Sequence, residues 1–282
     1  MTGPFQGGPD PPAVSAIVVS YNTRDDLLRC LASLAAHVRL PLEVLVVDNA
    51  STDGSAHAVR QRYPAARVLE RTANRGFSTA NNEGIRASAG SQVLVLNPDA
   101  EVTAGAVEAL SARLEARPEV GLVGPLTRSP DGAVQVSFGP DLTLLSEWRQ
   151  RRLVRAVRQR RPAALREAEA QASREHEPDW VSGSCFLARR EALLAVGGFD
   201  EGFFLYEEDA DLCRRLRRAG WRILFTPAAE VRHGLGRSMD RFPALARLEY
   251  RKSHLRYYRK HNGPASTALL RAYLGLSGLF GR

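Results

Sequence analysis

Strand and helix patterns alternate between residues 14 and 96, and this alternation restricts the fold more than any other feature of the chain. Short β-branched and aliphatic runs are separated by segments whose apolar residues have helical spacing. Strands are expected at 14–20, 42–47, 66–70 and 93–96, with helices ending near 36 and 63 and a third over 78–88. This order is typical of a doubly wound sheet, so we predict an α/β fold with a mostly parallel sheet flanked by helices.

Composition indicates a folded protein and narrows the class of ligand. Of 282 residues, 44% are hydrophobic and 25% are charged, which is enough for one large core or two small ones. The formal net charge of +8 comes almost entirely from arginine, since only Lys252 and Lys260 are lysines. Arginine favours an anionic ligand, a lipid surface or nucleic acid, although a general preference for arginine and alanine would give the same excess.

The cysteines and the apolar runs indicate the compartment. Cys30, Cys185 and Cys213 lie in apolar or helical patterns without zinc-ligand spacing, so we expect reduced core thiols of a cytosolic protein. Residues 1–12 lack a basic start and an apolar centre, and they are expected to form a flexible leader. The chain has no run of about 18 apolar residues, so we expect no membrane span.

Polar residues follow the expected strands at their carboxyl ends, where doubly wound sheets bind ligands. The apolar run 93–96 stops at Asn97-Pro98-Asp99, because proline cannot donate to a strand ladder. Asn97 and Asp99 offer oxygen ligands that suit a hard divalent cation bound to a diphosphate. A strand-to-helix turn in which Asp99 is a local cap would use the same residues.

The first half of the chain also contains candidates for binding a nucleotide. Tyr21, Asn22 and Asp48 follow the first two strands, and Asp48 could accept the imide N–H of uracil or thymine. A turn in the sequence DNAS is the simpler role for Asp48. Arg75 precedes the third helix and Asn81 lies within it, so both are candidates for contacting the base or a phosphate.

An acidic cluster in the second half suggests acid–base chemistry. Glu207, Glu208 and Asp209 follow the aromatic run 203–206 and open a helix that ends with basic residues. Acids at a helix start can be simple caps. Against an aromatic wall, however, desolvation and like charge would raise the pKa of one carboxyl group, as a general base requires.

A basic segment over 147–178 interrupts the α/β pattern. It carries eight arginines and no acid between 149 and 166, with Leu153, Val154 and Val157 on one helical face. Amphipathic helices are expected at 242–261 and 266–280, within a C-terminal extension over 241–282. These segments suit either a basic lid with core helices or peripheral contact with an anionic membrane.

Seven ordered motifs resemble those of a known family. In chain order they are VVSYN at 18–22, VVDNASTDGS at 46–55, NRGFSTANNEGI at 74–85, LNPDAEV at 96–102, GSCFLARR at 183–190, FFLYEEDADLCRRLRRAGW at 203–221 and VRHGLGRS at 231–238. Together they resemble the inverting family 2 glycosyltransferases, especially the rhamnosyltransferase-like branch with Asn-Pro-Asp in place of Asp-x-Asp.

The resemblance implies a GT-A fold over 13–240 and assigns several roles. It implies a nucleotide-sugar donor and a divalent metal, Mg²⁺ or Mn²⁺, with His233 of the HGxGxS-like loop joining Asn97 and Asp99. By the Glu-Asp motif, Asp209 is expected to be the general base and Glu208 to position it. Asn97 in place of an aspartate removes one formal charge, which should weaken metal binding unless the diphosphate supplies the rest.

The two halves of this domain are expected to bind different substrates. Residues 13–126 would bind the donor through Tyr21, Asn22, Asp48, Arg75, Asn81 and Asn97. Residues 179–240 would bind the acceptor and carry the base, with Trp180, Gly183 and Ser184 on the acceptor side. Branch resemblance favours dTDP-rhamnose among dTDP- and UDP-sugars, transferred with inversion to a hydroxyl of a glycan or lipid-linked acceptor in the cytoplasm.

Two other function classes fit parts of the sequence. A sugar nucleotidyltransferase also needs a doubly wound sheet and a metal, but it is expected to have a Gly-rich phosphate loop where this chain has YNTRDD. A non-catalytic module that binds nucleic acid or another anion is supported only by the arginine-rich segment. That segment lacks interleaved aromatic residues, so no nucleic-acid partner is expected.

Overall fold

The computed structural model describes residue 5, residues 12–234 and residues 243–279. The first half contains β1 (Val14–Ser20), α1 (Arg24–His37), β2 (Leu42–Asp48), α2 (Ser55–Arg62), β3 (Arg67–Glu70), α3 (Gly76–Ala87), β4 (Gln92–Leu96), β5 (Ala100–Val102), α4 (Ala106–Ala116) and β6 (Val120–Arg128). The second contains β7 (Val134–Gln135), β8 (Phe138–Gly139), α5 (Leu144–Arg158), α6 (Pro162–Ala172), β9 (Trp180–Val181), β10 (Cys185–Arg189), α7 (Arg190–Ala195), α8 (Glu208–Arg218), β11 (Arg222–His233), α10 (Pro243–His261) and α11 (Gly263–Leu279).

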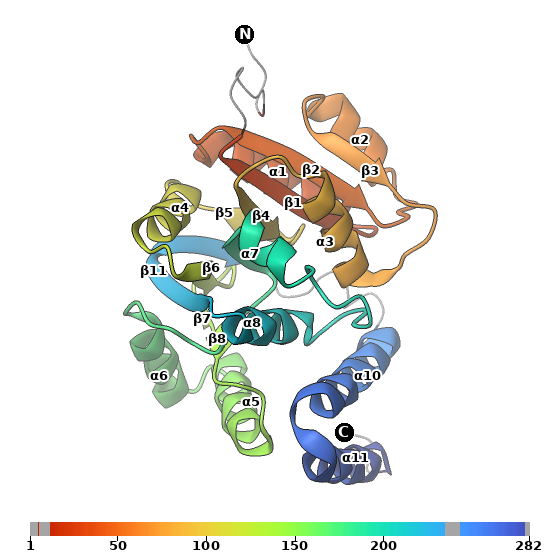
Figure 1. The fold of residues 1–282 in the computed structure, drawn as a ribbon, viewed down its shortest axis with the longest axis vertical. Coiled ribbons are helices and arrows are strands. Elements are labelled where there is room, and N and C mark those ends of the chain that lie inside the picture. Colours follow the sequence, from red (N-terminus) through yellow and green to blue (C-terminus); the bar gives the residue numbers. More distant parts are fainter. Residues whose placement is uncertain (1–4, 6–11, 235–242, 280–282) are drawn as a thin grey trace.

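One mixed sheet forms the centre of the molecule, in the order β3-β2-β1-β4-β10-β6-β11-β5 with β7 beside β6 (Figure 1). The strands β3, β2, β1 and β4 are parallel to one another, and β6 is parallel to β11, which confirms the predicted doubly wound α/β fold. β10 is antiparallel to both β4 and β6. The strand order reverses between β1 and β4, so a switch point lies at their carboxyl ends.

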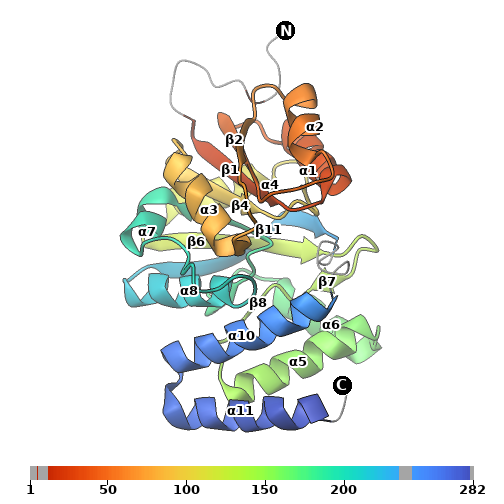
Figure 2. The same ribbon diagram turned by 90° about the vertical axis from the view of Figure 1, so that its right-hand side faces the viewer.

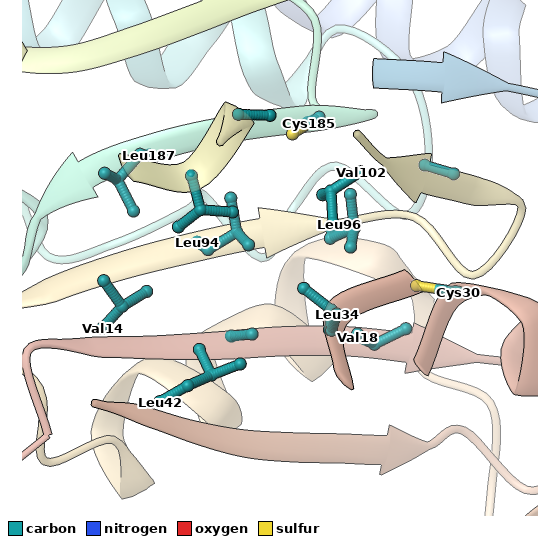
Figure 3. Packing of buried hydrophobic residues seen from close by; sticks show 14 of the residues in the cluster. Val14, Val18, Cys30, Leu34, Leu42, Leu94, Leu96, Val102, Cys185 and Leu187 are labelled. Carbon is teal, nitrogen blue, oxygen red and sulfur yellow. The ribbon is translucent and has the colours of Figure 1, made fainter. Parts of the chain in front are cut away.

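Buried side chains alternate between the two faces of the sheet. Val14, Ala16 and Val18 of β1 point into a core formed with α1 and α4, whereas Ile17 and Val19 point into a second core with α3, α7 and α8. Figure 3 shows the first core, where Cys30 of α1 packs above the strands. Cys30, Cys185 and Cys213 are free and buried, as the sequence predicts.

The arginine-rich segment and the C-terminal helices form a helical layer beside the sheet. α5, α10 and α11 are stacked at one end of the molecule (Figure 2). Leu153 and Val157 of α5 pack into the second core, while Tyr257, Tyr258 and Leu270 form a third core with α8. Among the described residues, none of the helices is long and apolar enough to cross a membrane.

Most predicted boundaries lie within two residues of the observed ones. α3 begins at Gly76 instead of 78, because this glycine with a φ of 87° is a poor local signal of a helix start. α11 begins at Gly263 instead of 266, with Pro264 in its first turn. Of the predicted leader, Phe5 and Pro12 are described; residues 235–242 and 280–282, which include the end of the loop after His233 and the predicted helix ends, lie outside the described residues.

Candidate active site

A cavity of about 450 Å³ lies at the switch point, where β1 and β4 end. Its wall combines these strand ends with the β9–β10 turn, the start of α8 and the end of β11. Of the predicted site residues, those that line it are Tyr21, Asn97, Asp99, Trp180, Gly183, Ser184, Glu208, Asp209 and His233. The fold therefore brings together side chains from both halves of the chain.

Asn97, Asp99 and His233 converge on one edge of this cavity. β11 pairs antiparallel with β5, so His233 lies opposite Ala100, and the Gly234 N–H donates to the Asp99 carbonyl at 2.9 Å. The His233 Nε2 atom lies 3.2 Å from Asp99 Oδ1 and 3.4 Å from Asn97 Nδ2. Sheet pairing thus joins residues that are far apart in the sequence.

Gln135 of β7 fixes the tautomer of His233. The His233 Nδ1–H donates to Gln135 Oε1 at 3.0 Å, and Gln135 Nε2 donates to the His233 carbonyl at 2.8 Å. In the neutral ring, Nε2 is then an acceptor that faces the Asp99 carboxylate. Two acceptors 3.2 Å apart repel each other unless a proton or a cation lies between them.

This donor set fits a divalent cation. An imidazole nitrogen, a carboxylate oxygen and an amide, whose O and N can be exchanged by a flip, are usual ligands, and the Gln135 contact is a typical outer partner of a ligating histidine. Within the described part of the chain, no group of three or more His, Cys, Asp and Glu side chains forms a metal site. The proposed ligand set has only two residues of these types, Asp99 and His233, because its third member is the amide of Asn97.

We expect Gln135→Leu to weaken Mn²⁺ binding by roughly 10- to 100-fold, because the His233 ring loses the contact that fixes its tautomer and orientation. The measurement is the apparent dissociation constant for Mn²⁺ in the presence of a nucleoside diphosphate. Gln171→Leu, on an exposed face of α6, is the matched control. Equal Mn²⁺ affinities for the Gln135 variant and the wild type would mean that the Gln135 contact does not orient His233 for metal binding.

Asp209 lines the cavity from the first turn of α8. Its Oδ2 atom accepts the Gly183 N–H at 2.8 Å, and its Oδ1 atom accepts the Ala210 N–H at 2.8 Å. A Cβ at position 183 would lie 3.4 Å from the Asp209 Cβ, which is an ordinary van der Waals contact. Burial raises the pKa of Asp209 to about 6, against the lowering effect of the Gly183 N–H.

Glu208 is the more deeply buried neighbour. Its side chain lines the cavity, and its Oε2 atom has no hydrogen-bond partner among the described residues. Burial, and then the nearby charge of Asp209, raises the pKa of Glu208 well above the usual range. Two adjacent carboxyl groups with raised pKa values in one cavity are typical of acid–base sites.

A buried ionic network holds the start of α8 against the helical layer. His254 of α10 contacts Glu207 through Nδ1 at 2.9 Å and Glu147 of α5 through Nε2 at 3.1 Å. Although burial lowers it, these two carboxylates raise the pKa of His254 to about 9. His254 therefore carries a positive charge at neutral pH and links α5, α10 and Glu207, the residue that precedes α8.

We expect His254→Gln to lower the free energy of unfolding by about 2 kcal/mol at pH 6.5, because Glu207 loses its charged partner and Glu147 keeps only Arg151. The pKa is raised on folding, so the wild-type advantage is full below about 6.5 and is lost as pH rises through about 9. Urea unfolding at several pH values measures it. The exposed His57→Gln on α2 is the control, and a pH-independent difference would contradict the charge argument.

Strained backbone surrounds the cavity. Asn22, Ala50, Tyr206 and Glu207 have φ values of 54°, 69°, 70° and 64°, a region that residues with a side chain rarely adopt. They lie after β1, after β2 and directly before α8. Two consecutive residues with positive φ before α8 raise the free energy of the folded backbone. Such strain is often found at catalytic sites, where the surrounding structure fixes the direction of side chains.

The loop between β3 and α3 forms part of the cavity wall through Asn74. Asn49 Nδ2 donates to Asn74 Oδ1 at 2.7 Å, and the Arg75 N–H donates to Asn49 Oδ1 at 3.2 Å. A Cβ on Gly76 would lie 2.4 Å from the Phe204 carbonyl oxygen, so only glycine permits this approach. The loop is thereby joined to the segment that precedes α8.

The structure places four predicted donor residues outside the cavity wall. Asn22 Oδ1 accepts the Thr52 N–H at 2.7 Å, and the Arg75 side chain is exposed. Asn81 is fully buried and donates to the Phe77 carbonyl at 3.0 Å. Asp48 accepts the Ser51 N–H at 3.0 Å through Oδ2, while its buried Oδ1 has no hydrogen-bond partner in the described part of the chain. Their contacts with a ligand stay predictions.

Several residues of the site were not predicted from the sequence. Asn49 and Asn74 lie within the motifs at 46–55 and 74–85, but a pairing of two distant amides has no local signal. Gln135 and His254 lie on segments without any of the seven motifs. Tyr250 lines the cavity from α10, which belongs to the predicted C-terminal extension.

Solved structures with the same fold bind nucleotide sugars. The mannosyltransferase PcManGT from Pyrobaculum calidifontis, solved with GDP-Man and Mn²⁺, is 20% identical, with a TM-score of 0.58 over 98% of this chain and 82% of that one. GalNAc-T7, solved with UDP, GalNAc and Mn²⁺, is 16% identical, with a TM-score of 0.59 over 79% of this chain and 44% of that one. At these identities the likeness shows the GT-A fold.

Sequence comparisons are more specific. The N-acetylglucosaminyl-diphospho-decaprenol L-rhamnosyltransferase of Mycobacterium tuberculosis is 38% identical over 257 residues, which are 84% of this chain and 81% of that protein. The model of the family described as glycosyltransferase-like family 2 matches residues 11–256, a range that contains every residue of the candidate site. The chain therefore belongs to the family 2 glycosyltransferases and is a glycosyltransferase with a GT-A fold.

Proposed function

We propose that this glycosyltransferase moves rhamnose from dTDP-rhamnose to a hydroxyl of a sugar attached through diphosphate to a polyprenol. One observation carries the mechanism: Asp209, with a pKa of about 6, lies in the same cavity as the cluster of Asn97, Asp99 and His233. A base that is ionised at neutral pH and a site for a metal-bound diphosphate are what an inverting transfer requires.

Transfer would proceed by one displacement. The Asp209 carboxylate takes the proton from the acceptor hydroxyl, whose oxygen attacks the anomeric carbon from the face opposite the nucleotide. The bond to the diphosphate oxygen breaks, the nucleoside diphosphate leaves, and the anomeric configuration inverts. The Gly183 N–H holds the carboxylate in place, and the raised pKa of Glu208 favours a neutral acid that does not repel it.

A divalent metal held by Asn97, Asp99 and His233 would neutralise charge on the departing diphosphate. The chemistry of the donor set supports this role, since the His233 and Asp99 acceptors face each other. Both GT-A structures described above contain Mn²⁺. Asn97, Asp99 and His233 supply only one carboxylate. The affinity for Mg²⁺ or Mn²⁺ therefore depends on the charge that the diphosphate adds.

The donor and acceptor are assigned from two kinds of support. The M. tuberculosis relative is named as an L-rhamnosyltransferase acting on a diphospho-decaprenol sugar, which supports rhamnose and a lipid-linked acceptor. Asp48 is the predicted partner of a base with an imide N–H, as in thymine or uracil, and its buried Oδ1 atom has no hydrogen-bond partner among the described residues. Nucleotide sugar use and reduced, buried cysteines support a cytoplasmic active site at the inner face of a membrane.

Incubation with a panel of dTDP-, UDP- and GDP-sugars and a sugar-diphosphate-lipid acceptor tests this function. We expect acceptor-dependent release of dTDP from dTDP-rhamnose, and an NMR spectrum showing an anomeric configuration opposite to that of the donor. A product with retained configuration would contradict the single displacement. Release of pyrophosphate from dTTP and rhamnose 1-phosphate would indicate a nucleotidyltransferase instead.

A further inference from the structure

An apolar groove with a basic rim lies between α5 and α11, apart from the catalytic cavity at the ends of β1 and β4. It has a volume of about 560 Å³, and its apolar lining consists of Leu144, Trp148, Leu269, Leu270 and Tyr273. Trp148, Leu269 and Tyr273 are 55%, 61% and 56% exposed, which is unusual for large apolar side chains gathered at one place. Helix faces of this kind normally pack against another apolar surface.

Arginines of α5 form the rim of the groove. Arg151, Arg152 and Arg155 line it, and the Arg152 guanidinium lies 4.6 Å from the centre of the Trp148 ring. Within the described residues, Arg152 and Arg155 make no ion pair, so their charges are available to an anion. Arg151 pairs with Glu147 at 2.8 Å, which neutralises the acidic residue of the lining.

A smaller hollow lies between this groove and the catalytic cavity. The hollow, of about 160 Å³, shares Trp180, Glu207 and Tyr250 with the catalytic cavity. It shares Glu147 and Arg151 with the groove. The three spaces therefore adjoin one another, in order from Asp209, past Arg151, to the exposed apolar side chains.

We propose that the groove binds the isoprenoid chain of the acceptor, with the acceptor diphosphate at Arg151, Arg152 and Arg155 and its sugar beside Asp209. The inference rests on the proposed function, because it assigns a subsite to the lipid-linked acceptor. Such an acceptor has three parts: a polar sugar, a dianionic linker and an apolar chain. They follow the same order as the catalytic cavity, the smaller hollow and the groove. Arginine suits the linker because its guanidinium forms paired hydrogen bonds with phosphate oxygens.

Direct binding of farnesyl diphosphate tests the groove without any transfer reaction. EDTA is included so that the diphosphate is not bound through a metal. Entry of the isoprenoid should shift the fluorescence of Trp148 to shorter wavelength, and the shift should be absent in Trp148→Phe. We expect Leu269→Gln, and separately the double variant Arg152→Gln with Arg155→Gln, to weaken binding about tenfold each.

Matched controls come from exposed residues outside the groove. Leu194→Gln on α7 and the pair Arg161→Gln with Arg166→Gln should bind farnesyl diphosphate like the wild type. Failure of wild-type protein to bind it, or equal affinities for the groove variants and the wild type, would overturn the proposal. If the groove variants lose binding to phosphatidylglycerol vesicles but keep it for farnesyl diphosphate, a bilayer is the occupant and the proposal is also overturned.

Kinetics with two acceptors separate this proposal from the proposed function. For a polyprenyl acceptor, Leu269→Gln should raise KM about tenfold with kcat unchanged; for an acceptor with the same sugar and diphosphate but a short alkyl chain, KM should not change. The proposal is supported if Leu269→Gln reduces the difference in KM between the two acceptors. An unchanged KM of this variant for the polyprenyl acceptor contradicts it. If the wild type transfers to neither acceptor but binds farnesyl diphosphate through the groove, the proposed function fails and the lipid site stands.

Discussion

Asp209→Asn should lower kcat by roughly two to four decades and leave donor affinity little changed, because the variant keeps the shape of the side chain but cannot take a proton. The wild-type rate should rise with pH through about 6, as the Asp209 carboxyl group ionises, and then level off. The residual rate of the variant should lack this rise. Initial rates over pH 5 to 8, with donor binding measured separately, provide the test.

Glu207→Gln is the comparison for this variant, because Glu207 adjoins the same cavity but contacts His254. Its loss of kcat should be far smaller than that of Asp209→Asn. Equal losses would mean that the acidic cluster acts as a unit, and the separate role of Asp209 would be wrong. An Asp209 variant that turns over at the wild-type rate would remove the residue from the mechanism altogether.

Stability provides a check that loss of activity is not loss of folding. The pKa of Asp209 is raised on folding, so its favourable contribution is present below the unfolded value and is lost as pH rises through about 6. At pH 7 the buried carboxylate therefore destabilises the folded state. Asp209→Asn should have a Tm at pH 7 equal to or above that of the wild type.

Asp99→Ala is the second change with a large expected effect, a loss of roughly two to three decades in kcat/KM. The side chain is almost fully buried beside His233, and its removal takes away the single carboxylate of the proposed metal set. Binding of the nucleoside diphosphate should weaken strongly in Mn²⁺ and little in EDTA. Calorimetric titrations under the two conditions measure this difference.

Glu101→Ala is the matched control for Asp99, since Glu101 lies two residues further along the chain, on β5, with an exposed side chain near Arg29. It should bind nucleoside diphosphate like the wild type in both conditions. If Asp99→Ala weakened binding equally with and without metal, Asp99 would contact the ligand or support the fold without holding a cation. The shared metal site would then be incorrect.

The sequence predicts the strand ends of the site better than the directions of its side chains. The buried run before Asn97 identifies both a strand and the edge at which it ends, so Asn97 and Asp99 follow from local pattern. The roles of His233 and Asp209 were predicted from the family resemblance. Both residues are far from Asn97 in the sequence, and only sheet pairing and the β9–β10 turn bring them near it. Both residues line the same cavity as Asn97.

The rest could not be predicted because it depends on long-range packing. Position after a strand does not say whether a side chain lines the cavity, as Tyr21 does, or holds a neighbouring loop, as Asn22 does. Likewise, His254 has the local surroundings of an ordinary helical residue. Its role arises from Glu147 of α5 and from Glu207, which directly precedes α8.

The position of His254 in the chain also determines when the active site can be completed during synthesis. His254 follows its partner Glu207 by 47 residues, so the proposed base and the proposed metal residues leave the ribosome before the helix that neutralises the acidic network. Until α10 docks, Glu147 and Glu207 lack their common cation and Phe203 lacks its cover from the third core. Because partly folded chains with exposed apolar surface aggregate readily, we expect a nascent chain at this stage to depend on the docking of α10 for protection.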